Sequence, residues 1–194
     1  MGLINIGGLM PSYTNEKEIK EKIEIFKGEF HTFIKEKLDI EDMEYLIDIG
    51  TIRNIDGFPE DSIKASTIIS KYESKVEKVV FFTKSISADI NFRFAKITNS
   101  NMFKEVVSLY IMFVFIHELV HVKQIKNGMK IEEYNEIEYK INEFEQEAND
   151  KAKEILSEFG EFQREISYII YSNKMVDNYS FIELIKLYKE KEFQ

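Results

Sequence analysis

The longest apolar stretch of the chain lies near its centre and predicts one buried helix. From 103 to 116 most positions are apolar around the full circumference of a helix, and such a helix is either buried or spans a membrane. The uninterrupted apolar part is shorter than the roughly 20 residues that a span needs, and charged residues follow it directly. We therefore expect a buried helix over about 101–127, with Ser100 or Asn101 as N-cap and Gly128 at its end.

Other segments repeat their apolar positions every three or four residues, which predicts amphipathic helices on both sides of the buried one. One helix is expected from Asn15 to about Lys37, and a second long one over about 131–159, closed by Gly160. Two shorter helical patterns follow at about 162–172 and 180–191. The stripe of the second long helix consists of Tyr134, Ile137, Ile141, Phe144, Ala148, Ala152, Ile155 and Phe159.

Between 43 and 98 the pattern changes to one that is typical of a small sheet. Residues 45–52 and 79–83 are rich in β-formers, 54–59 reads as a turn, and 60–72 could form a short helix. Residues 88–97 alternate apolar and polar side chains, which predicts the clearest strand of the chain. A small antiparallel or mixed sheet should therefore precede the buried helix, and the fold class is α+β.

The composition narrows the possible functions and suggests one domain. The chain has 194 residues and 44% hydrophobic residues, enough for a single core. We expect one domain over 1–194, with an N-terminal helical segment (1–40), a sheet region (43–98), metal-site helices (100–159) and C-terminal helices (160–194). The net charge of −9 argues against nucleic acid as a partner. The start of the sequence does not resemble a signal peptide, so we expect a cytoplasmic protein without a membrane partner.

The buried helix carries the motif H-E-x-x-H at His117, Glu118 and His121. Two His four residues apart lie one turn apart on the same helical face, so both rings can reach one ion. Zn²⁺ accepts imidazole nitrogen in tetrahedral geometry, and Glu118 is placed to take a proton from water that the metal activates. The chain has no cysteine, which leaves His and carboxylate as the strong ligand types. The sequence therefore predicts a zinc site with a third ligand further on.

Two motifs together resemble those of a known family. His117-Glu-Leu-Val-His121, followed by Glu145-Gln-Glu147-Ala-Asn-Asp-Lys-Ala152, is similar to the H-E-L-x-H … E-x-E-A-N-x-x-A signature of ImmA/IrrE-type metallopeptidases. These belong with the gluzincins, zincins whose third ligand is Glu. The resemblance covers about 100–156 and implies a zincin-like fold. It also implies zinc bound by His117, His121 and Glu147, with Glu118 as general base and acid.

The third ligand is the point on which two arguments differ. At about 100° per residue, Glu145 lies closer than Glu147 to the centre of the apolar stripe that should pack on the buried helix, and Glu143 points away. The family pattern instead favours Glu147, the residue directly before Ala148 and Asn149. We take Glu147 as the predicted ligand and keep Glu145 as the alternative.

These residues predict a zinc endopeptidase that acts on a protein or peptide. The strand expected at 88–97 could bind an extended substrate by strand addition. No spacing selects an oxyanion-stabilising residue among Tyr168, Tyr171 and Tyr179, and His31 is interpreted as an ordinary surface or partly buried histidine. Two alternatives are a zincin-fold binding or regulatory protein with a structural or vestigial metal, and an α+β interaction protein without metal.

Overall fold

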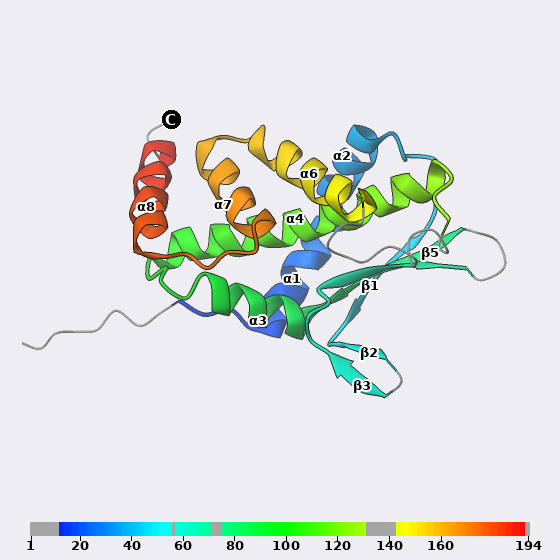
Figure 1. The fold of residues 1–194 in the computed structure, drawn as a ribbon, viewed down its shortest axis with the longest axis horizontal. Helices are drawn as coiled ribbons and strands as arrows, with labels where there is room; N and C mark the ends of the chain where they lie inside the picture. The colour runs from blue at the N-terminus through cyan, green and yellow to red at the C-terminus, as the bar shows by residue number, and fades with distance from the viewer. Residues whose placement is uncertain (1–11, 56, 71–74, 131–142, 193–194) are drawn as a thin grey trace, which may run out of the picture.

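The computed structural model of the chain describes residues 12–55, 57–70, 75–130 and 143–192. It is an α+β structure in which helices surround one long central helix and a small sheet lies beside it (Figure 1). The helices are α1 (Glu16–Phe26), α2 (Glu29–Leu38), α3 (Thr83–Arg93), α4 (Ser100–Lys126), α6 (Glu143–Ser157), α7 (Glu161–Tyr171) and α8 (Asn178–Glu192). The strands are β1 (Leu46–Gly50), β2 (Arg53–Ile55), β3 (Phe58–Glu60), β4 (Ala65–Ile69) and β5 (Val76–Phe82).

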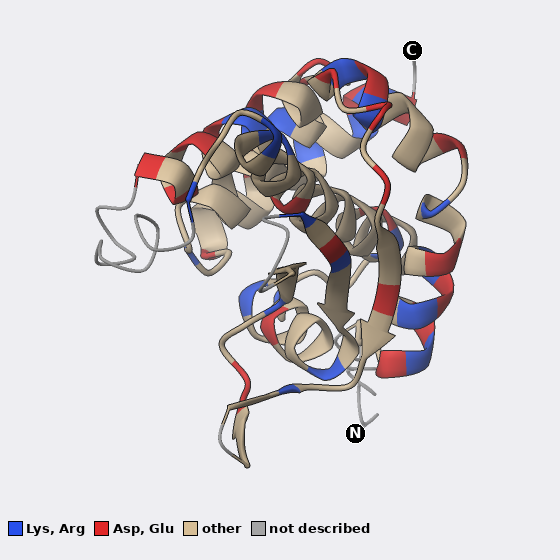
Figure 2. Ribbon diagram, turned by 90° about the vertical axis from the view of Figure 1, so that its right-hand side faces the viewer, with Lys and Arg blue, Asp and Glu red and all other residues tan. Residues whose placement is uncertain are grey.

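Helix α4 is the predicted central helix and forms the middle of the core. The side chain of Asn99 caps its N-terminus by accepting a hydrogen bond from the backbone N–H of Met102, one residue before the predicted caps. Gly128 follows its end with φ +96°, which confirms the predicted stop. Among the helices of the described ranges, only α4 is long and apolar enough to span a membrane, and 72% of its most apolar window is buried inside the protein. Figure 2 looks nearly along α4 and shows it mostly free of charged residues, while the outer helices carry many.

The sheet that precedes α4 is mixed, as one of the two predicted options. Its strand order is β1-β5-β4, with β1 parallel and β4 antiparallel to β5. Val79 and Phe81 of β5 are fully buried, and the Phe81 ring stacks on Phe115 of α4 with ring centroids 5.0 Å apart. This contact joins the sheet to α4. Because β5 is the middle strand, β4 lies at one edge of the sheet.

The strand predicted at 88–97 is wrong, because this segment begins in helix α3 and continues as a turn. The alternation that suggested a strand includes Ala88 and Phe92, and both are exposed, Phe92 by 62%. The buried residues recur instead at helical spacing, with Ile86, Ile90 and Phe94 on the face that packs into the core. A period-two reading of the apolar residues therefore selected the wrong face.

Two further segments differ from the sequence expectations, and one expected turn is confirmed within narrower bounds. The short helix expected at 60–72 is wrong, because β4 pairs with β5 there and its β-branched residues suit a strand. The turn expected at 54–59 is the tip of the β2–β3 hairpin, with Gly57 at φ +85°. The single helix expected from Asn15 divides into α1 and α2 at Gly28. The first part of the helix expected at 131–159 lies outside the described residues.

Helix α6 brings the second motif to the first. It packs along α4 (Figure 1), and its residues Ala148 and Ala152 are fully buried. Small side chains allow two helix backbones to approach closely, so carboxylates beside this stripe can reach the histidines of α4. The described part of α6 confirms the predicted apolar stripe from Ala148 to Ile155.

Candidate metal centre

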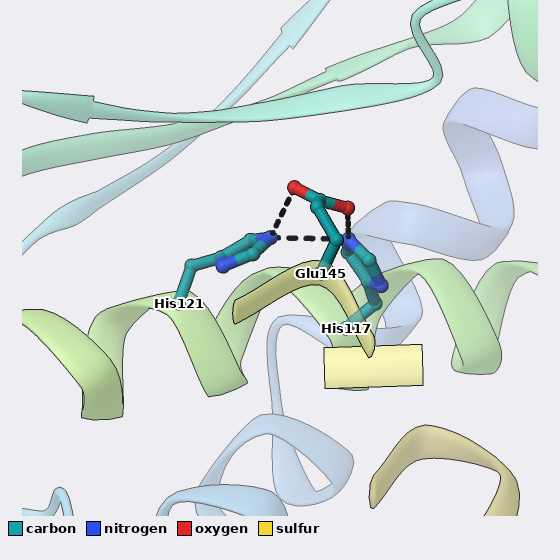
Figure 3. A group of neighbouring side chains, drawn as sticks. All are labelled: His117, His121 and Glu145. Atoms are coloured by element: carbon teal, nitrogen blue, oxygen red, sulfur yellow. Dashed lines mark hydrogen bonds and ion pairs between the residues drawn. The ribbon is translucent and has the colours of Figure 1, made fainter. Parts of the chain in front are cut away.

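His117 and His121 of α4 and Glu145 of α6 come together in one group of possible metal ligands (Figure 3). One ligand atom from each side chain lies within 4.8 Å of the others. The Nε2 atoms of the two histidines are 3.1 Å apart. The Glu145 carboxylate faces both rings, with Oε2 3.4 Å from His117 Nε2 and Oε1 3.3 Å from His121 Nε2.

These separations fit three ligands of one zinc ion. Atoms bound tetrahedrally at about 2.0–2.1 Å from zinc lie about 3.3 Å from one another. The 3.1 Å between the two Nε2 atoms is close to that value, and Glu145 presents a different oxygen to each ring, at 3.3 and 3.4 Å, so its carboxylate can bind through either oxygen or through both. Two imidazoles and one carboxylate are also the donor set of a hydrolytic zinc site, which keeps its fourth position for water. The residues present therefore fit the predicted metal.

Hydrogen bonds to the far side of each ring fix which nitrogen faces the centre. Gln124 Nε2 donates to the Phe144 carbonyl oxygen at 2.9 Å and to Glu147 Oε2 at 2.7 Å, so the Gln124 amide oxygen must face His121. His121 Nδ1 therefore donates to Gln124 Oε1 over 2.8 Å. His117 Nδ1 donates in the same way to Asn149 Oδ1 over 3.1 Å. With Nδ1 of each ring used as a donor, Nε2 is the nitrogen that each ring presents to the centre, and the 3.1 Å between the two Nε2 atoms fits a proton or a metal ion shared there.

The charges around His121 favour a cation even when no metal is bound. Burial lowers the pKa of His121, but the hydrogen bond with Glu145 and the charges of Glu118 and Glu145 outweigh it and raise the pKa from 6.5 to about 9. Burial also acts to raise the pKa of Glu145, yet its bonds to the two histidines hold that pKa well below the usual range. The carboxylate is therefore ionised, and in the metal-free protein a proton occupies the position that zinc would take.

We expect zinc binding at pH 7 to release about one proton per chain. His121 with a pKa of about 9 is protonated at pH 7, and zinc can bind Nε2 only after that proton leaves. The apparent zinc affinity should then rise by up to about tenfold per pH unit between pH 6 and 9. Calorimetric titration in two buffers of different ionisation enthalpy measures the proton count, and a binding enthalpy that is the same in both buffers would contradict it.

Glu118, the predicted general base, is held beside this group by the sheet. Its side chain is buried, with 6% exposed. Thr67 of β4 donates from Oγ1 to Glu118 Oε2 over 2.9 Å, and the same hydroxyl lies 3.3 Å from the Glu118 carbonyl oxygen. One carboxylate oxygen is therefore fixed by Thr67, so the orientation of the carboxylate is set by β4 rather than by solvent.

All four side chains, His117, Glu118, His121 and Glu145, line one cavity of about 390 Å³. This volume is in the range of pockets that bind small ligands or a few residues of a peptide. One wall of the cavity is β4, from Ala65 to Ile69, and the opposite wall includes α4. The group thus has access to a ligand while its histidines stay largely buried.

Glu147 and the other residues considered from the sequence lie outside the group of possible ligands. Glu147, the ligand favoured by the family pattern, is exposed, and its carboxylate accepts from Gln124. His31 is half-buried and shares a 2.8 Å hydrogen bond with the Tyr45 hydroxyl, which agrees with its ordinary role. Among the described residues that line the cavity, the tyrosine is Tyr110, which donates to Asp89, and none of the three candidates for oxyanion stabilisation is there.

Three residues around the centre were missed by the sequence reasoning. Gln124 follows His121 at i+3, and Asn149 follows Glu145 at i+4, so both lie on the ligand-bearing faces of their helices. That spacing was a usable signal for side chains that support metal ligands. Thr67 had no such signal, because its contact with Glu118 joins residues 51 positions apart in the sequence.

Comparisons with protein-family models, with curated proteins and with solved structures found no match to this chain. The resemblance to ImmA/IrrE-type metallopeptidases therefore stays a prediction from the two motifs. The candidate metal centre is supported by the group formed by the side chains of His117, His121 and Glu145, which could hold a metal ion.

Proposed function

We propose that this protein is a zincin-like metallopeptidase that hydrolyses peptide bonds with the help of zinc. The observation that carries the proposal is the position of Glu118, a buried carboxylate that lines the same cavity as the possible ligand group. A metal site with a purely structural role has no need of a further carboxylate in an accessible cavity beside it. A hydrolytic site does need one, because water must lose a proton as it attacks.

Each side chain has a defined part in this reaction. His117, His121 and Glu145 would hold the ion, and bound zinc supplies Lewis acidity and lowers the pKa of water to about 7. Glu118 accepts the proton as water attacks the peptide carbonyl carbon and then delivers it to the leaving amine nitrogen. Thr67 keeps the Glu118 carboxylate in the orientation that both transfers require. Gln124 and Asn149 keep the Nε2 atoms of the two rings directed at the ion.

Strand β4 is the element best placed to bind an extended substrate, in place of the segment 88–97, which is helical. It lies at an edge of the sheet, and its residues from Ala65 to Ile69 line the cavity. The backbone groups on the outer side of an edge strand can pair with an added strand. A peptide bound along β4 would run past Thr67. It would therefore also run past Glu118, which Thr67 contacts.

The proposal is tested by zinc-dependent cleavage of peptides. Purified protein loaded with one equivalent of zinc is expected to cleave some members of a complex peptide mixture, to lose that activity with a chelator, and to regain it with added zinc. Mass spectrometry of the products identifies the new termini. Tight zinc binding without any cleavage would contradict the peptidase and favour a binding protein with a structural metal, and absence of zinc binding would contradict the centre itself.

A further inference from the structure

The cavity extends well beyond the candidate metal centre, and its far end has a different charge. Apart from Glu118 and Glu145, the charged residues among its described lining are Arg53, Lys64, Arg93 and Asp89. Three cations therefore face one carboxylate at that end, in a chain whose net charge is −9. A positive end of a cavity on an acidic protein favours a negative group of the ligand there, since the field inside a cleft is set by the nearby walls.

The single carboxylate at that end is already engaged by the protein. Asp89 Oδ2 accepts from Arg93 Nε at 2.5 Å and from the Tyr110 hydroxyl, and Lys64 Nζ lies 3.8 Å from Oδ1. Arg93 is only 8% exposed and is fixed further by the Asn173 side chain. This network holds Arg93 and Asp89 in place. Glu60, which does not line the cavity, also interacts with Arg53 and Lys64, and the cations of the lining still outnumber its one carboxylate at that end.

The residue spacing along two elements, taken between Cα atoms, gives a similar separation between residues at this end and residues at the candidate metal centre. Tyr110 and His117 are seven residues apart on α4, or about 10.5 Å at 1.5 Å per residue. Lys64 and Thr67 are three residues apart in the sequence, or about 10 Å in extended chain. The chain is extended at Lys64, because its carbonyl oxygen accepts from the Phe82 backbone N–H at 2.8 Å and so continues the β4–β5 pairing.

We propose that the far end of this cavity, lined by Arg53, Lys64 and Arg93, is a binding subsite for an acidic side chain of the peptide substrate. An extended peptide advances about 3.3–3.4 Å per residue, so a separation of about 10 Å corresponds to two or three residues from the cleaved bond. The favoured substrates therefore carry Asp or Glu at that position. This inference rests on the proposed peptidase function and specifies its substrate class.

The experiment is a cleavage profile of a tryptic peptide library from a whole proteome. Zinc-loaded wild type should cleave peptides in which Asp or Glu is enriched roughly tenfold two or three residues from the cleaved bond, the discrimination that one hydrogen bond to a charged group provides. Lys64→Glu should lose this enrichment, because it leaves two cations and two carboxylates in the lining at that end. Lys84→Glu, on an exposed residue of α3 that does not line the cavity, makes the same charge change and should keep the wild-type profile.

The outcomes separate the two proposals. Cleavage without acidic enrichment, or a profile that Lys64→Glu leaves unchanged, would overturn the subsite and leave the peptidase standing. No cleavage by zinc-loaded wild type would overturn both. Melting curves show whether Lys64→Glu folds, and Lys64→Gln, which only removes the charge, provides a second measurement by reducing the enrichment without abolishing it.

Discussion

Replacing Glu118 by Gln is expected to keep zinc binding and to lower the rate of peptide hydrolysis by about 10²–10⁴-fold or more. The amide has nearly the shape of the carboxylate, and its oxygen can still accept the hydrogen bond from Thr67. It cannot accept the proton of the attacking water at neutral pH, so the step that needs a base is lost. The loss should appear in kcat, because the substrate is still bound by the rest of the cavity.

The measurement compares zinc content, melting temperature and hydrolysis of one identified peptide for wild type and Glu118→Gln. Glu190→Gln, at an exposed position of α8, makes the same chemical change away from the cavity and should behave like wild type. Equal hydrolysis by wild type and Glu118→Gln would rule out Glu118 as the base. A Glu118→Gln protein that no longer holds zinc would instead point to a role in the centre itself.

The sequence predicted well those features that are determined within one segment. It predicted poorly those that depend on contacts between segments. The bounds of helix α4 were predicted closely. A run of apolar residues that ends in H-E-x-x-H is best explained by a buried helix with a metal site. The strand predicted at 88–97 was wrong because the spacing of its apolar residues fitted both the period of a strand and that of a helix. Only its neighbours decide which face is buried, and Phe92, an apolar residue, is 62% exposed.

The candidate centre shows the same division. His117, Glu118 and His121 follow from the local sequence, since one helix fixes their relative positions. Glu145 depends on how α6 packs against α4. Helical periodicity placed it nearer the apolar stripe, and its burial, with 4% exposed, agrees with that placement. Thr67 depends on the position of the sheet edge, and the sequence had predicted a helix there.

We expect Glu145→Ala to weaken zinc binding by at least about 100-fold, and Glu147→Ala to weaken it by about tenfold or less. The reason is their different positions on α6. The Glu145 carboxylate faces both histidine Nε2 atoms, whereas Glu147 accepts from Gln124 and so touches the centre only through His121. Gln124 keeps its bond to the Phe144 carbonyl oxygen without Glu147, so most of its orientation survives.

Zinc titration of Glu143→Ala, Glu145→Ala and Glu147→Ala in parallel decides between the two candidates for the third ligand. Glu143 is an exposed residue two positions before Glu145 on the same helix, so its variant controls for the loss of one negative charge near the centre and should bind zinc like wild type. A steep loss for Glu147→Ala with little change for Glu145→Ala would favour the family pattern over the packing of α6. A steep loss for Glu145→Ala alone would show that the ligand is the carboxylate nearest the apolar stripe. Helical periodicity, rather than motif alignment, would then be the better guide to the ligand on α6.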